Sequence, residues 1–343
     1  MKRLFALLLL CCMGIGRLQA ADGDSVYVVD CNGKGDFTSI QACFEALPAK
    51  ASEWRTIYVR PGVYREKLTL DVYKDKVALI GTGEGPEAVV IVWNDHSGKV
   101  VDGYEMTTYD CWSFSVQADE VFLRNVTIRN DAGRRGQAVA LETRGDRIWI
   151  DRCRIEGDQD TFFPKNYVAR LLVTDSYIEG TTDFIFGPSI VLFDRCHIHA
   201  KTNSFITAAS TTERNKYGFV FRDCCVTTDP QVTKLYLGRP WKSTARTVWM
   251  RCELPEAICP EGWHNWNDPN REKSSYYAEW QCTGPGADRS GRVAWSHAMS
   301  DDEAAEYTED QIYAKKTGSE QFHDEWHPLQ NGYLQALRTL KTE

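Results

Sequence analysis

One eight-residue pattern recurs along the middle of the chain and constrains its fold more than any other feature. Each copy has apolar residues two positions apart, then one or two polar residues, a small residue, a variable position and an apolar residue. No helix of about 10–12 residues fits between copies, so the pattern predicts a solenoid of strands, most naturally a parallel β-helix. The copies are VFLRNVTI (121–128), IWIDRCRI (148–155), LLVTDSYI (171–178), VLFDRCHI (191–198), FVFRDCCV (219–226) and TVWMRCEL (247–254).

The small position of this pattern indicates how the coils stack. Successive members lie 20 to 28 residues apart. Irregular spacing predicts loops of different length at one corner of the coil, which is where a solenoid builds its site. An ordinary β-sandwich with chance similarity between its strands is the alternative. The small position holds Val126, Cys153, Ser176, Cys196, Cys224 and Cys252.

The first 20 residues, MKRLFALLLLCCMGIGRLQA, have the composition of a secretory signal peptide. Lys2 and Arg3 precede a short apolar run, and Leu18 to Ala20 offer a small-residue cleavage site. The run is too short to cross a bilayer, and no later segment has about 18 consecutive apolar residues. We therefore expect residues 1–20 to be a signal peptide and residues 21–343 to form a single domain that is secreted or periplasmic.

The cysteines of the small position are expected to be free thiols. In an exported chain, disulfides are the usual expectation. Side chains stacked on neighbouring parallel strands point the same way, however, whereas a disulfide needs two converging Cβ atoms. The stacked cysteines should therefore act as small buried hydrophobic groups. This applies to Cys153, Cys196, Cys224 and Cys252, while the pairing of Cys31, Cys43, Cys259 and Cys282 stays open.

The segments that flank the repeats should close the coil. SIQACFEAL (39–47) has helical spacing and is expected to cap the N-terminal end. Residues 257–343 are rich in Trp, Gly and charge and lack the pattern, which predicts loops and one or two helices over the C-terminal end. The net charge of −8 argues against a nucleic-acid partner, and we expect a monomer without a membrane span.

Two Asp residues follow neighbouring copies of the pattern at the same distance. Asp160 of GDQDTFF (157–163) stands five residues after Ile155, and Asp183 of GTTDFIFG (180–187) stands five residues after Ile178. Equal offsets on successive coils predict that the two carboxyl groups face each other. Such a pair in a partly apolar cleft cannot keep two ordinary pKa values, so one can act as nucleophile and the other as acid and base. A lone Asp in this place more often caps a turn, but a pair in register favours catalysis.

A cation and two amides accompany the carboxyl pair. Arg239 of LGRPW (237–241) stands between a Gly and a Pro, so its guanidinium can be aimed and can pair with a carboxylate through two hydrogen bonds. Gln137 and Gln159 offer neutral amide donors of the kind that suits an oxyanion formed in a transition state. Hydrogen bonding in a ladder inside the coil is the alternative for each glutamine.

Other catalytic sets are missing from the sequence. It has no Gly-x-Ser-x-Gly elbow, and its histidines show no zinc spacing. His197 and His199 share one face of a strand, where an exposed sheet face is favoured over a metal site. We therefore expect no metal and no cofactor.

Several motifs in order give the chain a family resemblance. The match extends from about Val26 to Trp295 and resembles the pectin methylesterase (pectinesterase) family, carbohydrate esterase family 8. The segments EGWHNW (261–266) and AEWQCTGPGADRSGRVAW (278–295) resemble its C-terminal region. The motifs that carry the resemblance are GVYREKL (62–68), GQAVAL (136–141), GDQDTFF, GTTDFIFG, GFVFRDC (218–224) and YLGRPW (236–241).

The resemblance implies a fold, a substrate and a role for each motif residue. It implies a right-handed parallel β-helix that demethylates galacturonate esters of pectin through an acyl-enzyme, without a metal. Asp158 and Thr182, each just before a motif residue, depart from the more apolar or aromatic types common in the family, a difference that concerns subsite preference more than chemistry. The implied roles are nucleophile for Asp183, acid and base for Asp160, oxyanion donors for Gln137 and Gln159, orientation of Asp183 for Arg239, and substrate binding for Trp241, Arg239 and Gln137.

Two other functions fit parts of the same pattern. A β-helix glycosidase or lyase that cuts the polysaccharide chain would also carry paired carboxylates. A non-catalytic carbohydrate-binding solenoid would keep the fold and the aromatic residues. Loss of Arg239 or of either Asp would favour the second, and all three are present.

Overall fold

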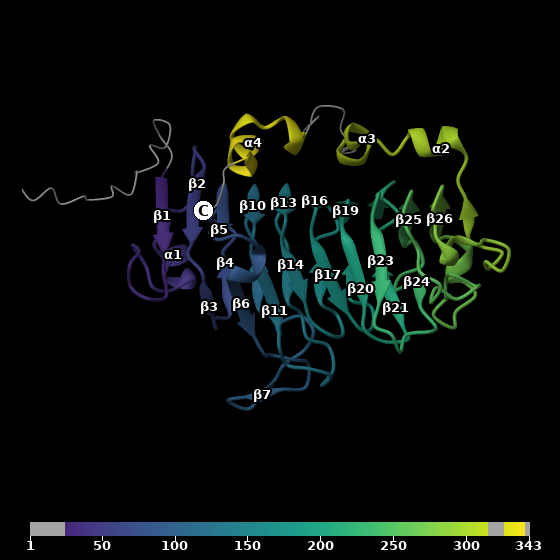
Figure 1. The fold of residues 1–343 in the computed structure, drawn as a ribbon, viewed down its shortest axis with the longest axis horizontal. Helices are drawn as coiled ribbons and strands as arrows, with labels where there is room; N and C mark the ends of the chain where they lie inside the picture. The colour runs from purple at the N-terminus through teal and green to yellow at the C-terminus, as the bar shows by residue number, and fades with distance from the viewer. Residues whose placement is uncertain (1–24, 315–325, 340–343) are drawn as a thin grey trace, which may run out of the picture.

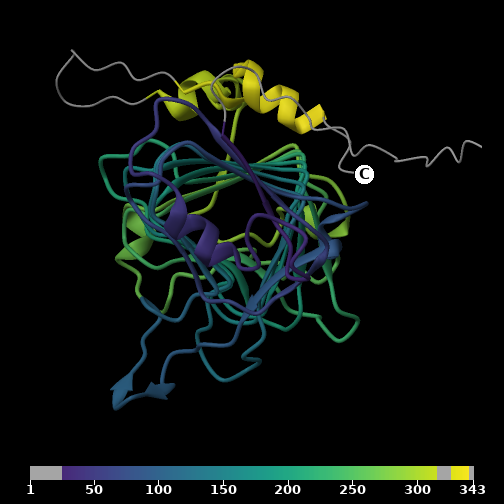
Figure 2. The same ribbon diagram turned by 90° about the vertical axis from the view of Figure 1, so that its left-hand side faces the viewer.

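The computed structural model describes residues 25–314 and 326–339 and has the predicted parallel β-helix as its body. Three parallel sheets run along its length, and most coils add one strand to each (Figure 1). The view from the N-terminal end looks along the stacked coils (Figure 2). The predicted fold class is confirmed, and the β-sandwich alternative is wrong.

The three sheets are named A, B and C here, and all their neighbouring strands pair in parallel. Sheet A contains β1 (Ser25–Val29), β2 (Arg55–Val59), β5 (Val77–Gly81), β10 (Val121–Arg124), β13 (Ile148–Asp151), β16 (Arg170–Thr174), β19 (Ile190–Asp194), β22 (Phe219–Arg222), β25 (Arg246–Met250), β26 (Tyr276–Trp280) and β27 (His297–Ala298). Sheet B contains β3 (Gly62–Tyr64), β6 (Val89–Trp93), β11 (Thr127–Asn130), β14 (Arg154–Glu156), β17 (Tyr177–Gly180), β20 (His197–Ala200) and β23 (Cys225–Thr228). Sheet C contains β4 (Leu68–Leu70), β9 (Phe114–Val116), β12 (Leu141–Thr143), β15 (Phe162–Pro164), β18 (Ile185–Gly187), β21 (Phe205–Ala209) and β24 (Tyr236–Pro240).

Each copy of the sequence pattern forms two strands that meet at a sharp corner between sheets A and B. The residue before the small position has a left-handed backbone in every copy, with φ between 49° and 55°. The chain turns there, and the next side chain points into the corner of the core, where little room is left. This geometry explains why the small position holds Cys, Ser or Val. The left-handed residues are Asn125, Arg152, Asp175, Arg195, Asp223 and Arg251.

The interior of the coil is filled by stacked side chains. Phe193, Phe221 and Trp249 lie on successive strands of sheet A, with ring centroids 4.4 and 3.9 Å apart along the stack. The predicted thiol ladder is confirmed, because all cysteines in the described part of the chain are unpaired. This includes the four whose pairing the sequence left open.

The N-terminal end is closed as predicted. Helix α1 (Ile40–Ala46) begins at Ser39, whose side chain accepts a hydrogen bond from the N–H of Ala42. Its Phe44 is buried and stacks on Phe114 of β9, with ring centroids 5.7 Å apart. The helix therefore seals the first coils of the core.

The prediction for the C-terminal segment is wrong in two respects. Residues 276–282 continue the pattern, because β26 adds a strand to sheet A and Cys282 follows the same corner. Helices α2 (Asp301–Ala305), α3 (Glu309–Tyr313) and α4 (Gly332–Thr339) then run back along the outer face of sheet A instead of covering the C-terminal end (Figure 1).

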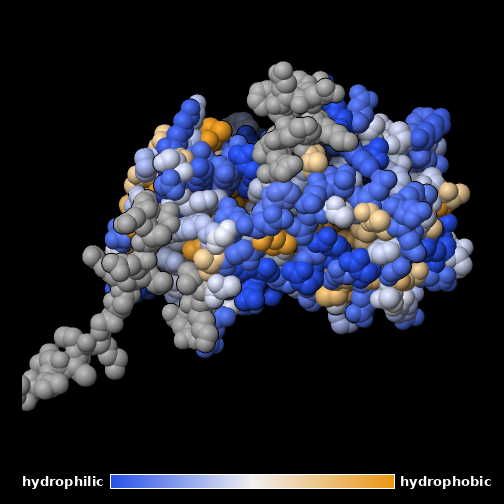
Figure 3. Space-filling model, turned by 90° about the horizontal axis from the view of Figure 1, so that it is seen from above, coloured by the Kyte–Doolittle hydropathy of each residue, from blue (hydrophilic) through white to orange (hydrophobic). Residues whose placement is uncertain are grey.

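The apolar outer face of sheet A gives the physical reason for this course. Phe122, Trp149 and Leu172 point outward from three of its strands and would be exposed without the helices. The helices bury them, and the outside seen from this side is mostly hydrophilic with scattered apolar groups (Figure 3).

Short 3₁₀ turns occur at Pro86–Ala88, Arg271–Lys273, Pro285–Ala287 and Pro328–Gln330, and a small antiparallel hairpin of β7 (Val100–Val101) and β8 (Tyr104–Glu105) projects from the body.

Candidate active site

The two aspartates lie on neighbouring coils at equivalent positions, as predicted. Ile155 of β14 pairs in register with Ile178 of β17. Asp160 then lies between β14 and β15, and Asp183 lies between β17 and β18. The N–H of Asp160 donates to the carbonyl oxygen of Thr182 on the next coil, 3.1 Å away. Equal offsets from paired residues therefore bring both carboxyl groups to the corner between sheets B and C.

Both aspartates have an unusual backbone conformation. The angle φ is +64° at Asp160 and +50° at Asp183, in the left-handed region that few residues adopt. Asp is among the residues that tolerate it, because its short side chain can bond locally. The next coil holds the bend, since the N–H of Asp183 donates to the carbonyl oxygen of Phe205 at 2.9 Å.

Arg239 pairs with one aspartate through two hydrogen bonds. Its Nε lies 2.9 Å from Oδ1 of Asp183, and its Nη2 lies 2.6 Å from Oδ2. Strand β24 carries Arg239 next to Ala208 of β21, on the outer face of sheet C. The structure thus brings together the pair that the Gly–Arg–Pro motif predicted, in the planar geometry that guanidinium and carboxylate favour.

The two carboxyl groups have different electrostatic surroundings. Burial raises the pKa of Asp160 well above its ordinary value, the charge of Asp183 raises it further, and Arg239 opposes both. Burial also raises the pKa of Asp183, but the hydrogen bonds and charge of Arg239 oppose it. In the part of the chain that the structure describes, no group donates a hydrogen bond to the carboxyl of Asp160. Asp160 is therefore the carboxyl that keeps its proton, while Asp183 is the one that ionises first.

The two glutamines lie side by side as well. Gln137 and Gln159 form a parallel bridge between neighbouring coils, and both are half-buried. Gln159 directly precedes Asp160, and its carbonyl oxygen accepts the N–H of Ala138 at 3.0 Å. The neutral amide of Gln159 therefore lies on the same coil as Asp160, and that of Gln137 lies on the preceding coil.

An aromatic wall on sheet C completes the site. Phe163 and Phe186 stack with ring centroids 4.1 Å apart, and Trp241 lies 6.5 and 6.0 Å from them. Phe163 stands three residues after Asp160, and Phe186 three residues after Asp183. These two rings were not predicted as site residues from the sequence, although the equal offsets that predicted the aspartates also apply to them.

Two further rings were missed because they come from distant segments. The guanidinium carbon of Arg239 lies 3.9 Å from the ring centroid of Phe205 and 3.7 Å from that of Trp266. Trp266 belongs to the EGWHNW segment, which the sequence analysis used only as a sign of family resemblance. No periodic signal links that segment to Arg239.

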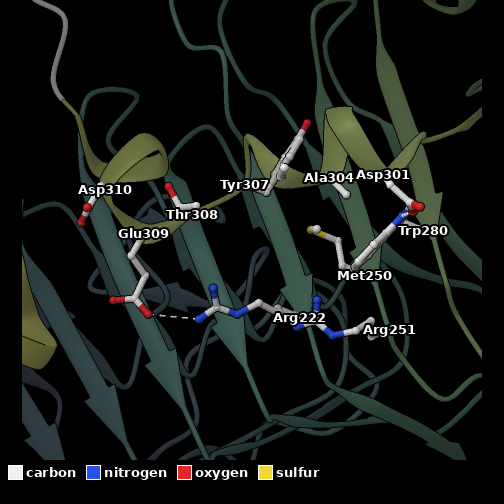
Figure 4. A pocket seen from close by; sticks show the side chains of 11 residues that line it. Arg222, Met250, Arg251, Trp280, Asp301, Ala304, Tyr307, Thr308, Glu309 and Asp310 are labelled. Carbon is white, nitrogen blue, oxygen red and sulfur yellow. Dashed lines mark hydrogen bonds and ion pairs between the residues drawn. The ribbon is translucent and has the colours of Figure 1, made fainter.

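A hollow on the outer side of sheet A contains none of the predicted site residues. It has a volume of about 460 Å³ and lies between sheet A and helices α2 and α3 (Figure 4). Arg222 at its wall donates to Glu309 at 3.1 Å and to Asp194 at 2.7 Å, and Trp280 donates to Asp301 at 2.9 Å. These polar groups are paired within the fold, so the hollow has no counterpart to the carboxyl of Asp160, with which no described group pairs.

Comparison with known proteins places the chain in an enzyme family. The family model described as Pectinesterase matches residues 26–316. Pectinesterase 31 of Arabidopsis thaliana is 35% identical over 283 residues, which cover 80% of this chain and 88% of that protein. Putative pectinesterase 11 of the same plant is 36% identical over 281 residues, which cover 80% and 75% of the two chains.

Solved structures agree with the sequence matches. Pectin methylesterase from carrot superposes with a TM-score of 0.79 at 29% identity, over 86% of this chain and 94% of that one. Pectin methylesterase from Aspergillus niger in deglycosylated form gives a TM-score of 0.71 at 28% identity, over 83% and 92% of the two chains.

Proposed function

The chain belongs to the pectinesterase family, and from that premise we propose how its cleft performs the reaction. The chain is a carboxylic ester hydrolase that removes methyl esters from galacturonate residues of pectin and releases methanol. This function replaces the two alternatives, a chain-cleaving enzyme and a non-catalytic binding solenoid. The observation that carries the proposed mechanism is the pairing of Arg239 with Asp183 beside a second, unpaired carboxyl at Asp160.

In the first half of the reaction, Asp183 is the nucleophile. Its ionised carboxylate attacks the carbonyl carbon of the methyl ester and forms a tetrahedral oxyanion. The amides of Gln137 and Gln159 donate hydrogen bonds to that oxyanion. The bond to the methoxy oxygen then breaks, Asp160 gives its proton to this oxygen, and methanol leaves an acyl group on Asp183.

In the second half, Asp160 changes from acid to base. Its carboxylate takes a proton from a water molecule, whose oxygen attacks the acyl carbon. The bond to the Asp183 oxygen breaks, which restores both aspartates and frees galacturonic acid, whose remaining proton from the water passes to solvent. The raised pKa that burial gives Asp160 suits both steps, because it favours the protonated form that the first step needs and makes the carboxylate a stronger base for the second.

Substrate binding is assigned to groups around the reacting carbon. Trp241, on the outer side of sheet C and half-buried, offers an apolar ring to the face of a sugar. Arg239 and Gln137 offer donors to the ester and the neighbouring hydroxyl groups. We assign no metal to the reaction, because Arg239 and the two glutamines supply the positive charge and the donors that the mechanism requires.

The cellular location and the domain organisation are inferred from the sequence. We infer that residues 1–20 are a signal peptide, that residues 21–343 form one domain, and that the enzyme acts as a monomer, secreted or in the periplasm. Residues 1–20 lie outside the described part of the chain. Within the described part, none of the helices combines the length and the apolar character needed to cross a bilayer.

One assay on the purified protein tests the proposal directly. Highly methyl-esterified pectin should release methanol, and it should gain carboxylate groups without gaining reducing ends. A chelator should leave the rate unchanged. A gain of reducing ends in step with the methanol would contradict the proposed reaction, and so would a chelator-sensitive rate.

A further inference from the structure

The guanidinium of Arg239 is held between two aromatic faces. Phe205 covers one side at 3.9 Å and Trp266 covers the other at 3.7 Å, measured from the guanidinium carbon to each ring centroid. A cation over an aromatic face is stabilised by about 0.5–2 kcal/mol, and more when water is excluded. Two such faces on opposite sides also fix the plane of the guanidinium. Only that plane allows both hydrogen bonds to Asp183.

Phe205 is tied to the nucleophile through its backbone as well. Its carbonyl oxygen accepts the N–H of Asp183 at 2.9 Å, while its ring lies against Arg239. The ring is supported from behind by Tyr236, whose centroid lies 5.1 Å away in a stacked arrangement. One residue therefore sets the backbone of the nucleophile and one face of its cation.

Trp266 reaches Arg239 only because its backbone is bent. Its φ is +61°, a region that bulky residues rarely adopt. His264, two residues earlier, holds the bend, because the N–H of Trp266 donates to Nδ1 of His264 at 3.0 Å. His264 in turn continues sheet C beyond β24, where its own N–H donates to the carbonyl oxygen of Gly238 at 3.2 Å.

The surroundings of His264 favour the form that can accept this hydrogen bond. Only a deprotonated Nδ1 can accept, so the bond is lost when the ring becomes charged. Burial lowers the pKa of His264, and the charges of Arg239 and Lys234 lower it further. The rings packed on it are those of Phe205 and Tyr236.

From these contacts we propose that Phe205, Trp266 and His264 are positioning residues for the esterase reaction. The two rings hold the Arg239 guanidinium in the plane that pairs with Asp183, and His264 holds Trp266 over Arg239. The proposal rests on the mechanism proposed above, in which an ionised Asp183 attacks the ester. Its consequence is that loss of either ring loosens the ion pair and makes Asp183 easier to protonate.

The first experiment compares Trp266→Leu and Phe205→Leu with the wild-type protein. Loss of one cation–π contact should lower kcat/KM about three- to thirtyfold. The acid limb of the pH profile should move to higher pH, by up to about one unit, because a carboxylate that loses its cation gains a proton more readily. A variant that is merely less well folded would lose activity without moving this limb.

The second experiment separates the hydrogen bond of His264 from its ring. His264→Phe keeps an aromatic ring but removes the acceptor, so it should shift the acid limb as Trp266→Leu does. His264→Asn places an oxygen where Nδ1 stands, and Asn readily accepts the N–H two residues on. His264→Asn should therefore keep the wild-type limb.

Trp280→Leu is the matched control. Trp280 is also half-buried, and it lies 5.5 Å from the guanidinium carbon of Arg251 on the far side of the molecule. It should leave the acid limb in place. Unshifted limbs in both Trp266→Leu and Phe205→Leu would overturn the proposal, and equal losses in His264→Phe and His264→Asn would overturn the part played by His264. Absence of methanol release by the wild-type protein would instead contradict the proposed function itself.

Discussion

The outer faces of sheets A and C both carry aspartates, arginines and aromatic rings, but the two faces differ in how many cations surround each carboxylate and in how far the rings are buried. On sheet A, the carboxylate of Asp151 is fully buried and accepts hydrogen bonds from Arg124, from Thr174 at 2.6 Å and from Arg338 at 3.1 Å. Two cations thus contact this one carboxylate, and Arg338 also pairs with Asp175. On sheet C the ratio is reversed, because Arg239 is the one cation among the described residues that acts on both Asp160 and Asp183.

The aromatic rings differ in the same sense. Phe122 and Trp149 on sheet A are completely buried beneath the C-terminal helices. On sheet C, Trp241 and Trp266 stay half-exposed beside the aspartates. Paired cations and a cover of helices thus stabilise the outer face of sheet A, whereas on sheet C the shortage of cations favours the protonated form of one carboxyl, and the lack of a helical cover leaves aromatic rings accessible to a sugar.

The largest expected effect comes from removing one carboxylate on each face. Asp183→Asn should lower the rate of methanol release by about 10⁴-fold or more, because the amide cannot attack the ester. The fold should persist, since Asn keeps the shape and tolerates a left-handed backbone. Thermal unfolding and methanol release on the same preparation measure the two quantities.

Asp151→Asn is the partner in this test. It leaves the buried Arg124 without its carboxylate, while Arg338 keeps its ion pair with Asp175, so the melting temperature should fall. The molecules that remain folded should release methanol at the wild-type rate. A folded Asp183→Asn protein with near wild-type activity would contradict the assignment of Asp183 as nucleophile. It would also contradict the division between a catalytic carboxylate on sheet C and a structural one on sheet A.

The next largest effect concerns Asp160. Asp160→Asn cannot carry a proton, so kcat should fall by about 10²–10⁴-fold. The thermal stability of Asp160→Asn at neutral pH should rise, although its activity falls. Because the pKa of Asp160 is raised in the folded protein, its contribution to stability is fully present at acidic pH and is lost as the pH rises towards that pKa. Asn escapes this loss, so the variant should melt above the wild-type protein at neutral pH, and the gap should close in acid.

The pH profile gives a third test with a smaller effect. Activity needs Asp183 ionised and Asp160 protonated, so kcat/KM should follow a bell. Burial raises both pKa values, and Asp160 more than Asp183, so both limbs should lie above the ordinary carboxyl range. The carboxyl groups of buried aspartates can titrate over a range of about pH 4 to about pH 9. A rate that stays flat over this range would contradict the assignment of Asp183 as nucleophile and Asp160 as acid.

Features of the fold and of the site that repeat along the chain could be predicted from the sequence. The coil, the thiol ladder and the carboxyl pair all follow from equal offsets in successive copies, and the structure confirms each. The pairing of Arg239 was predictable because Gly and Pro restrict the backbone on both sides. The aromatic pair of Phe163 and Phe186 was predictable in principle by the same offsets.

Features that do not repeat were missed for a physical reason. The path of α2 to α4 is set by the apolar outer face of sheet A, and that face exists only once the coils are stacked. Trp266 reaches Arg239 through a left-handed bend about 27 residues further along the chain, a tertiary contact without any local signal. Side chains that come from the ends of a solenoid therefore need the structure to be placed.

A fourth test compares exposed rings on the two faces. Trp241→Ala should raise KM for pectin several-fold with kcat little changed, because a ring that packs on the sugar away from the reacting carbon serves ground and transition states alike. Trp280→Ala, on the side of sheet A, should leave KM unchanged. A large drop in kcat with constant KM in Trp241→Ala would mean that the ring acts on the chemistry instead.

The smallest effect on activity is expected from the thiol ladder, which lies in the core corner between sheets A and B, away from the cleft. Cys224 Sγ accepts the N–H of Cys196 at 3.4 Å and donates to the carbonyl oxygen of Phe193 at 3.4 Å. Ser176 makes the same kind of pair, since its Oγ accepts the N–H of Cys153 at 3.0 Å and donates to a carbonyl oxygen.

Ser should therefore replace Cys at this position with little loss, whereas Ala should cost about 1–2 kcal/mol because the N–H of Cys196 loses its acceptor. Denaturant unfolding of Cys224→Ser and Cys224→Ala measures the difference, and both should release methanol at the wild-type rate. Equal destabilisation by the two substitutions would show that packing of the sulfur matters more than its hydrogen bonds. A mapped disulfide between Cys196 and Cys224 would remove the ladder altogether.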